Sequence, residues 1–356
     1  MKNKLQTAMC ALLFLLMAAF PQAAAQGVRN ALEICLEMVI PSLFPLMFAS
    51  LLLTKSCGNG KLSRTIGKPV KILFGVPECG AKAIASAVLG GYPAGAAAVS
   101  SMYKEGQLTK AEAEKLAYVA VSAGPAFVIG AVGSGIYSSV TIGIMLLSVQ
   151  ILSVIIVGMI IHFLESEKTS YKQLATEKIN NKNIFVISAS DSARSLLSVC
   201  TFVVLFGAIG GLITALRIDS AAAYVLKMLK VPDKIADSAI MMLLEVSSGC
   251  IKASKISIEA VAFVLGFGGF SVHFQIYSLV CQLGVNKLKF TLLRFGQGVI
   301  CALLAYFAKM LLPNEVVETA ALSAPKAMPS VTGCVCLVIM CLMMLFCCPI
   351  HLTKKE

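Results

Sequence analysis

Charged residues are scarce in this chain. Lys, Arg, Asp and Glu make up 13% of its 356 residues, against about 25% in soluble globular domains. Hydrophobic residues account for 58%. This balance excludes a soluble globular protein and predicts an all-α, polytopic membrane protein.

Catalytic motifs are also lacking. The sequence has no Gly-x-Ser-x-Gly, no His-Glu-x-x-His and no phosphate-binding loop, and its three histidines lie far apart. The 13 cysteines form no Cys-x-x-Cys pair, so we interpret them as small residues that face lipid or the core. The loop lysines form no basic and aromatic face for nucleic acid. We expect no catalytic residue, metal site, cofactor or nucleic-acid partner, and therefore not an enzyme.

The surplus of positive charge, 30 Lys and Arg against 18 Asp and Glu, lies mostly in short loops between apolar runs. Such loops favour the cytoplasmic side, which predicts a bacterial inner-membrane protein with both termini in the cytoplasm. One region, 217–257, falls on the predicted outer side and yet holds six basic residues. An interfacial helix with anchoring lysines would explain part of this cluster, and so would a wrong count of spans.

Ten apolar segments are long enough to enter a membrane, where a spanning helix needs roughly 20 residues. Eight are predicted to span it, namely 6–25, 31–54, 114–134, 139–164, 195–216, 258–281, 292–312 and 331–349. The other two, 78–103 and 235–254, are interrupted by Tyr92-Pro93-Ala94-Gly95 and by Ser247-Ser248-Gly249. We predict that these two are re-entrant hairpins.

The first 26 residues resemble a signal peptide, with Lys2 and Lys4 before an apolar stretch and small residues before Gln26. A retained first helix fits this pattern equally well. We favour retention, because cleavage would keep the next basic loop on the same side only by changing the number of spans.

The chain contains an internal repeat. Val76-Pro77-Glu78 and Val231-Pro232-Asp233 each follow a short basic segment and precede an interrupted hairpin, and a glycine-broken span then follows in both halves. An odd number of spans separates the two hairpins, so the repeats are predicted to be inverted. The predicted domains are an N-terminal helix or signal-like segment, a first repeat, a cytoplasmic linker, a second repeat and a C-terminal loop with a last span, at 1–30, 31–165, 166–190, 191–312 and 313–356.

Four broken segments, 90–96, 122–133, 245–250 and 265–275, carry the prediction of a site. Unpaired backbone groups cost several kcal/mol in hydrocarbon, so non-helical backbone at membrane depth must be buried in protein or line a watery cavity. We therefore expect the four segments to meet around one polar-solute site. Its predicted residues are Tyr92, Pro93, Gly95, Gly124, Pro125, Glu245, Ser247, Ser248, Gly268, Gly269, Ser271, His273 and Gln275.

Several of these residues have a second interpretation. Glu245 lies in an otherwise apolar run, which favours a functional carboxylate, although a position near the outer interface would explain it too. His273 either contacts solute or ties down the loosened backbone. The serines and Tyr92 are also common as ties between membrane helices.

The motifs GGYPAGA, SAGPAFVIGAVG and GFGGFSVHFQ together resemble the YlbJ-like family of sporulation integral membrane proteins, which carry the nucleoside-recognition or Gate domain. The resemblance extends roughly from the second predicted span to the seventh. It implies a transporter-like fold of two hairpin-bearing repeats and a role in making the spore cortex. Tyr92, Pro93 and Gly95 match the first motif, Gly124, Pro125 and Gly130 the second, and the third motif is matched by Gly268, Gly269, Ser271, His273 and Gln275.

The sequence thus predicts a permease that moves a small polar solute by alternating access. The resemblance to the YlbJ-like family implies a nucleoside-like solute. Its expected partners are the lipid bilayer, the solute and a coupling H⁺ or Na⁺ at Glu245. The sequence is also compatible with a homo-oligomer. The alternative is a non-transporting membrane scaffold of a sporulation complex.

Overall fold

The described part of the chain is helical throughout. The structure, a computed structural model, describes residues 2–56, 61–164 and 184–311, and its regular elements there are α-helices with short 3₁₀ and π-helical segments. The all-α class predicted from composition is confirmed.

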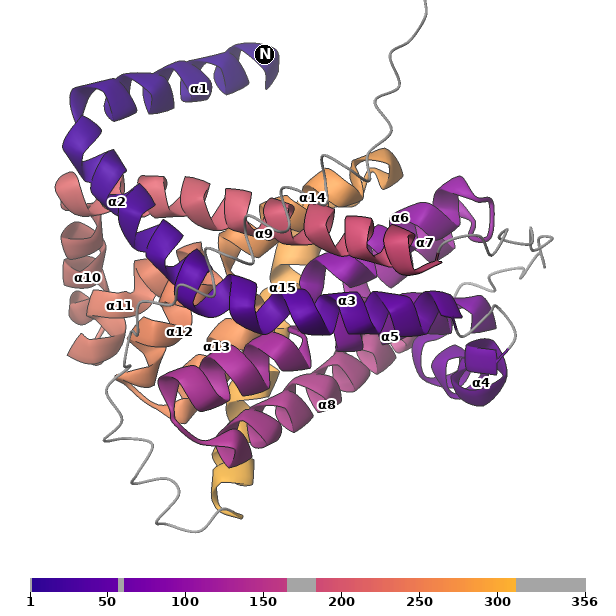
Figure 1. The fold of residues 1–356 in the computed structure, drawn as a ribbon. Helices are drawn as coiled ribbons and strands as arrows, with labels where there is room; N and C mark the ends of the chain where they lie inside the picture. Colours follow the sequence, from indigo (N-terminus) through magenta and orange to yellow (C-terminus); the bar gives the residue numbers. More distant parts are fainter. Residues whose placement is uncertain (1, 57–60, 165–183, 312–356) are drawn as a thin grey trace, which may run out of the picture.

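The N-terminal helices differ from the predicted spans. Helix α1 (Lys2–Ala19) ends just before Pro21, where α2 (Pro21–Ile34) begins and continues through the π-helical η1 (Cys35–Val39) into α3 (Ile40–Ser56). Proline at a first helical position starts a helix rather than extending one, so the run predicted as 6–25 is divided. Figure 1 shows α1 turned away from the bundle, while α2 lies against α9.

The first half continues with a short surface helix, a helix pair, a broken helix and a long helix. These are α4 (Lys61–Phe74), η2 (Glu78–Gly80), α5 (Ala81–Gly90), α6 (Tyr92–Lys104), α7 (Lys110–Val119), η3 (Ala126–Ile136) and α8 (Val140–Leu164). The start of α7 carries the capping box predicted by its sequence, in which Thr109 and Glu112 bond each other's backbone amides.

The second half repeats this order. It comprises α9 (Ile184–Ala215), α10 (Ile218–Met228), α11 (Asp233–Leu244), α12 (Val246–Ser254), α13 (Ile258–Phe267), α14 (Gly269–Leu279), η4 (Cys281–Leu283) and α15 (Lys287–Lys309). Helix α9 begins inside the segment predicted as linker, whose residues 166–183 lie outside the described residues. The repeated order of elements agrees with the predicted repeat, while the inverted relation stays a prediction.

Five helical stretches of the described chain are long and apolar enough to cross a membrane, namely Pro21–Ala49, Val140–Leu164, Ile184–Ala215, Ile258–Leu279 and Lys287–Lys309. They correspond to five of the eight predicted spans. The predicted first span contains only a shorter apolar helix, Thr7–Ala19, and the predicted third is broken ahead of η3. The predicted last span, 331–349, lies outside the described residues.

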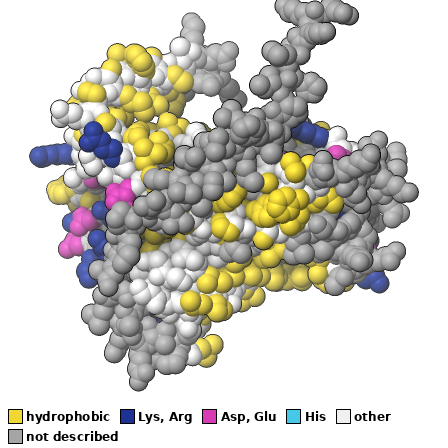
Figure 2. All heavy atoms as spheres, in the orientation of Figure 1, with side chains coloured by type: hydrophobic (Ala, Val, Ile, Leu, Met, Phe, Trp, Pro, Cys, Tyr) yellow, Lys and Arg dark blue, Asp and Glu magenta, His cyan; other side chains and the backbone are white. Residues whose placement is uncertain are grey.

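Apolar side chains face outward and polar ones face inward along the long helices. Leu152 of α8 and Leu303 of α15 are 46% and 56% exposed, whereas Ser153 and Gln297 on the same helices are buried. Hydrophobic side chains cover the middle of the face in Figure 2, and charged ones gather at its left over α10 and α11. There Lys227 pairs with Asp237 at 2.9 Å, which accounts for one of the six basic residues predicted on the outer side. Apolar exteriors over polar interiors are the arrangement that lipid requires.

Candidate functional site

Four breaks in the helices meet at the centre of the molecule. They are Gly91 between α5 and α6, the non-helical residues 120–124 after α7, Glu245 between α11 and α12, and Gly268 between α13 and α14. A β-carbon placed on Gly124 would lie 2.9 Å from the amide nitrogen of Gly91, and one on Gly269 would lie 3.1 Å from that of Val246. The hydroxyl of Tyr92 joins the two halves by donating to the carbonyl of Leu265 at 2.6 Å.

The first helix pair breaks one residue earlier than predicted. Gly91 has φ +84°, a backbone region that favours glycine, and Tyr92-Pro93-Ala94-Gly95 forms the first turn of α6. Pro93 is tolerated there because the first amides of a helix have no partner within it. The proline therefore marks the start of a helix, and the prediction that residues 92–95 are themselves the break is wrong.

The second helix pair breaks at Glu245 rather than at the predicted Ser247-Ser248-Gly249, which lies in α12. Glu245 has extended backbone, and its two carboxylate oxygens accept the amides of Ser247 at 2.8 Å and Ser248 at 2.7 Å. The carboxylate thus caps α12, because the first amides of any helix need an acceptor. Its side chain is buried within the protein, while the two interpretations of Glu245, a functional carboxylate and a position near the outer interface, stay predictions.

The break at Gly268 leaves the last carbonyls of α13 without helical partners. The backbone amide of Gly268 donates to the carbonyl of Val264. The carbonyl of Leu265 accepts the Tyr92 hydroxyl and, at 3.3 Å, the side-chain Nε2 of Gln150. The carbonyl of Phe267 accepts Nε of Arg294 at 3.4 Å. Side chains from other helices therefore replace the missing backbone donors, as buried backbone requires.

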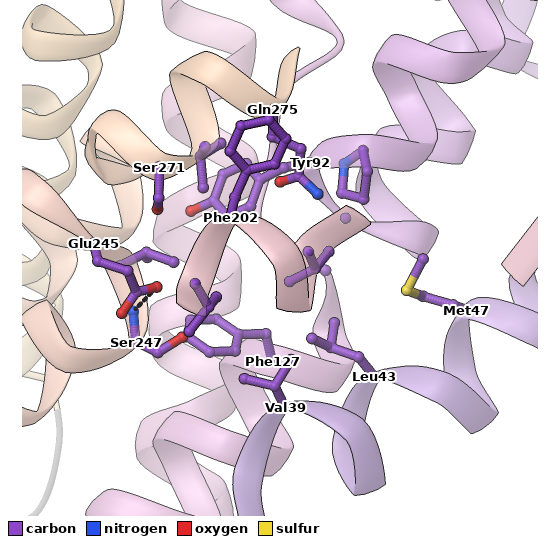
Figure 3. Close-up of a pocket in the computed structure, with 17 residues that line it drawn as sticks. Val39, Leu43, Met47, Tyr92, Phe127, Phe202, Glu245, Ser247, Ser271 and Gln275 are labelled. Atoms are coloured by element: carbon purple, nitrogen blue, oxygen red, sulfur yellow. Dashed lines mark hydrogen bonds between the residues drawn. The ribbon is translucent and has the colours of Figure 1, made fainter. Parts of the chain in front are cut away.

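A small cavity lies between the breaks. Its volume is about 40 Å³, which suits a water molecule or a monatomic ion. Its polar lining residues are Tyr92, Glu245, Ser247, Ser271 and Gln275. Figure 3 shows Glu245, Ser247 and Ser271 on one side of this space and Val39, Leu43 and Phe127 below them.

The structure places some predicted site residues at the cavity and others away from it. Those that line it are Tyr92, Pro93, Gly124, Glu245, Ser247, Ser271 and Gln275. Those that do not are Gly95, Pro125, Ser248, Gly268, Gly269 and His273. Gly95 and Gly269 of this second group lie where helices or breaks pack closely, Gly268 has φ +84° at the break itself, and Ser248 takes part in the cap of α12. No solute is present, so binding by the first group stays a prediction.

His273 lies in an aromatic cluster. Its Nδ1 donates to the carbonyl of Gly269, four residues earlier, at 2.6 Å. The centroid of its ring lies 4.7 Å from the ring centroid of Phe267 and 5.1 Å from that of Phe290. A carbonyl can only accept, so the proton is on Nδ1. This contact agrees with the interpretation that His273 ties down the loosened backbone.

A buried polar network beside the cavity was not predicted. Arg294 donates to Gln297 at 2.6 Å, Gln297 donates to Ser153 at 3.2 Å, and Cys301 lies 3.1 Å from the same hydroxyl. The spacing of 294, 297 and 301 places these residues on one helix face, which is the sequence signal that could have revealed them.

A much larger space of about 810 Å³ adjoins the first helix pair, and we call it the vestibule. Its lining includes Ser86, Ser101, Ser198, Gln107 and Gln282 together with the charged residues Lys82, Lys104, Glu105, Asp191 and Arg194. All of these lie on the predicted cytoplasmic side or in the first hairpin that enters from it. Pro93 borders both the vestibule and the small cavity.

Comparison with known proteins gives one informative relative. The chain is 26% identical over 335 residues to the sporulation integral membrane protein YlbJ of Bacillus subtilis (strain 168), and the alignment covers 84% of this chain and 82% of that protein. No family model and no solved structure matches the chain. The resemblance predicted from the glycine motifs is confirmed, while the Gate domain stays a prediction. The chain is an integral membrane protein that resembles the YlbJ-like sporulation proteins over most of its length.

Proposed function

We propose that this chain is a permease that moves a small polar solute through the bilayer by alternating access around the central cavity. The observation that carries the proposal is the convergence of broken helices from both halves on one cavity with a buried carboxylate, Glu245. Paired, discontinuous helices around a midplane site are the arrangement that secondary transporters use. The proposal assigns no catalytic chemistry to the chain.

The two spaces support a one-sided opening. The vestibule is about twenty times larger than the cavity and lies on the predicted cytoplasmic side, and the two share Pro93. A wide opening on one side that leads to a small central space is expected for a single conformer in an alternating-access cycle. We therefore assign this structure to an inward-facing conformer.

The size of the cavity separates two roles. About 40 Å³ holds a water molecule or a coupling ion, whereas drug-sized ligands occupy roughly 300–1,000 Å³. A nucleoside-sized solute would therefore enter the vestibule first, and the site at Glu245 serves the coupling H⁺ or Na⁺. Nε2 of Gln275 supports a polar occupant, because it is buried at the cavity and has no partner among the described residues.

The first experiment identifies the solute. Purified full-length protein is heated with nucleosides, cell-wall precursors and divalent metal ions in turn, since a compound that binds only the folded form raises the unfolding temperature. Uptake of a stabilising compound into proteoliposomes is then measured with and without a proton or sodium gradient. Gradient-dependent uptake supports the permease.

The role of Glu245 is tested with E245Q in the same proteoliposomes. Glutamine keeps an oxygen that can accept an amide of α12 but cannot carry the negative charge, so gradient-driven uptake should fall at least tenfold while the protein still inserts. The matched control is E259Q, because the Glu259 carboxylate pairs with Lys309 at 3.0 Å and does not line the cavity. Unchanged uptake in E245Q would remove the assigned role.

A second candidate function is a membrane scaffold for a sporulation complex. The similarity to a sporulation integral membrane protein favours it. A scaffold predicts that no compound in the screen stabilises the protein, and that bulky residues at Gly95 and Gly269 act only through folding.

A further inference from the structure

Arg294 is a buried cation that the proposed function does not use. It lies in the second turn of α15, and only 1% of its surface is exposed. Moving an isolated charge into an apolar interior is costly unless other groups compensate it. Its surroundings therefore have to supply negative charge.

Two backbone carbonyls from different halves of the chain contact the guanidinium. Nη1 donates to the carbonyl of Val121 at 2.8 Å, and Nε donates to that of Phe267 at 3.4 Å. Val121 follows the end of α7, and Phe267 is the last residue of α13. The carbonyl of Phe267 is at the end of α13, and that of Val121 lies in the non-helical stretch two residues beyond the end of α7.

Helix ends of this kind carry negative charge. Each C-terminus has the equivalent of about half an elementary charge, and two ends aimed at one point would attract a cation. Unwound carbonyls and half-helix C-termini bind coupling sodium ions in secondary transporters. Within the described residues, no carboxylate forms a salt bridge with Arg294.

Nε and Nη1 of the guanidinium donate hydrogen bonds, whereas Nη2 does not within the described part of the chain. Nη2 lies near Gly268, at 3.6 Å from the place of a β-carbon there, and has no hydrogen-bond partner among the described residues.

We propose that Arg294 is a built-in cation that occupies the place between the ends of α7 and α13 where a sodium ion would otherwise bind. The ends of α7 and α13 therefore need no bound ion to stay together. Arg294 acts as a positioning residue, because it keeps the two broken spans together beside the cavity.

The test compares variants of the full-length protein in sodium-free buffer. R294K retains a cation and should unfold within about 3 °C of the wild type, whereas R294Q and R294A should unfold at least about 5 °C lower. In the E245Q background, where the site at Glu245 no longer attracts sodium, millimolar sodium or guanidinium should raise the unfolding temperature of R294A and leave that of the protein with Arg294 unchanged. K287Q is the matched control, because Lys287 is an exposed cation on the same helix.

Two results would overturn the proposal. One is R294Q as stable as R294K, since hydrogen bonding alone would then suffice. The other is a folded R294A that responds to neither cation.

A second measurement does not depend on Arg294 variants that fold poorly. Wild-type protein and E245Q are heated in sodium chloride and in N-methylglucamine chloride. Sodium should not stabilise E245Q, because the remaining cation place is filled by Arg294, and stabilisation of E245Q by sodium would contradict the assignment. Neither measurement needs a solute, so this inference can fail while the uptake experiments still support the permease.

Discussion

Gly95 allows α6 to lie against the non-helical residues that follow α7. A β-carbon at this position would collide with the carbonyl oxygen of Ala120 and would stand 2.6 Å from the β-carbon of Ala87. Because the first of these neighbours is backbone, we expect G95A to lower the free energy of unfolding by about 1–3 kcal/mol, as overpacked cores do. Thermal unfolding of the purified protein measures this change.

Gly296 provides the control. A β-carbon there would meet nothing within 4 Å, and alanine is favoured over glycine inside a helix by about 0.5–1 kcal/mol. G296A should therefore equal or exceed the wild type in stability. If G95A were as stable as G296A, the close packing of α6 against residue 120 would be absent in solution.

The sequence revealed some residues of the site and concealed others. Glu245 was predictable because a carboxylate in an apolar run has few explanations, and its buried position agrees with that expectation. Arg294 was not, because a cation near the start of a spanning helix usually marks its aqueous end. The spacing of Arg294, Gln297 and Cys301 marks a shared helix face, but whether that face points inward depends on the helices packed around it.

At the scale of elements, the end of α13 depends on donors from two other helices. Tyr92 of α6 and Gln150 of α8 both donate to the carbonyl of Leu265. Y92F or Q150L alone leaves one donor in place and should cost about 0.5–1.5 kcal/mol each. The double variant leaves the carbonyl unsatisfied, which adds roughly 1–3 kcal/mol.

A double-mutant cycle on unfolding free energies tests this expectation. The two single changes should sum to clearly less than the double change. Strict additivity would show that the carbonyl finds another donor, such as a water molecule, when both side chains are removed.

The sequence located the helix breaks to within a few residues but misassigned their centres. Tyr-Pro-Ala-Gly and Ser-Ser-Gly were expected to be non-helical, and both form the first turn of a helix. Proline and serine are common at the beginning of helices because the first amides lack helical partners. The break lies at Gly91, one residue before the first motif, and at Glu245, two residues before the second.

At the scale of the whole molecule, the vestibule makes a prediction about access. Cys281 lines it and is exposed, whereas Cys250 is buried and does not line it. In variants that keep one cysteine each, a membrane-impermeant maleimide should label Cys281 in inside-out vesicles at least tenfold faster than in intact cells. Cys250 should react slowly in both preparations.

Rapid labelling of Cys281 from outside intact cells would reverse the predicted orientation, and the vestibule would then open outward. Slow labelling of Cys281 from both sides would contradict the vestibule itself. Cys250 separates these outcomes from a general loss of structure, because unfolding would expose both thiols.

Much of the architecture was predictable because lipid imposes simple length and polarity rules. The five long apolar helices and the repeated order of elements agree with the sequence. The N-terminal region does not, because hydropathy measures only how apolar a segment is and α1 and α2 divide their apolar run at Pro21. Packing against α9, which no local pattern encodes, sets the course of α2.

Pro93 lines both the vestibule and the small cavity. Proline has no backbone amide hydrogen, so Pro93 cannot donate a backbone hydrogen bond to a polar solute. In the proposed permease, a solute that passes from the vestibule to the cavity has to displace Pro93, so the access path depends on movement of the first turn of α6.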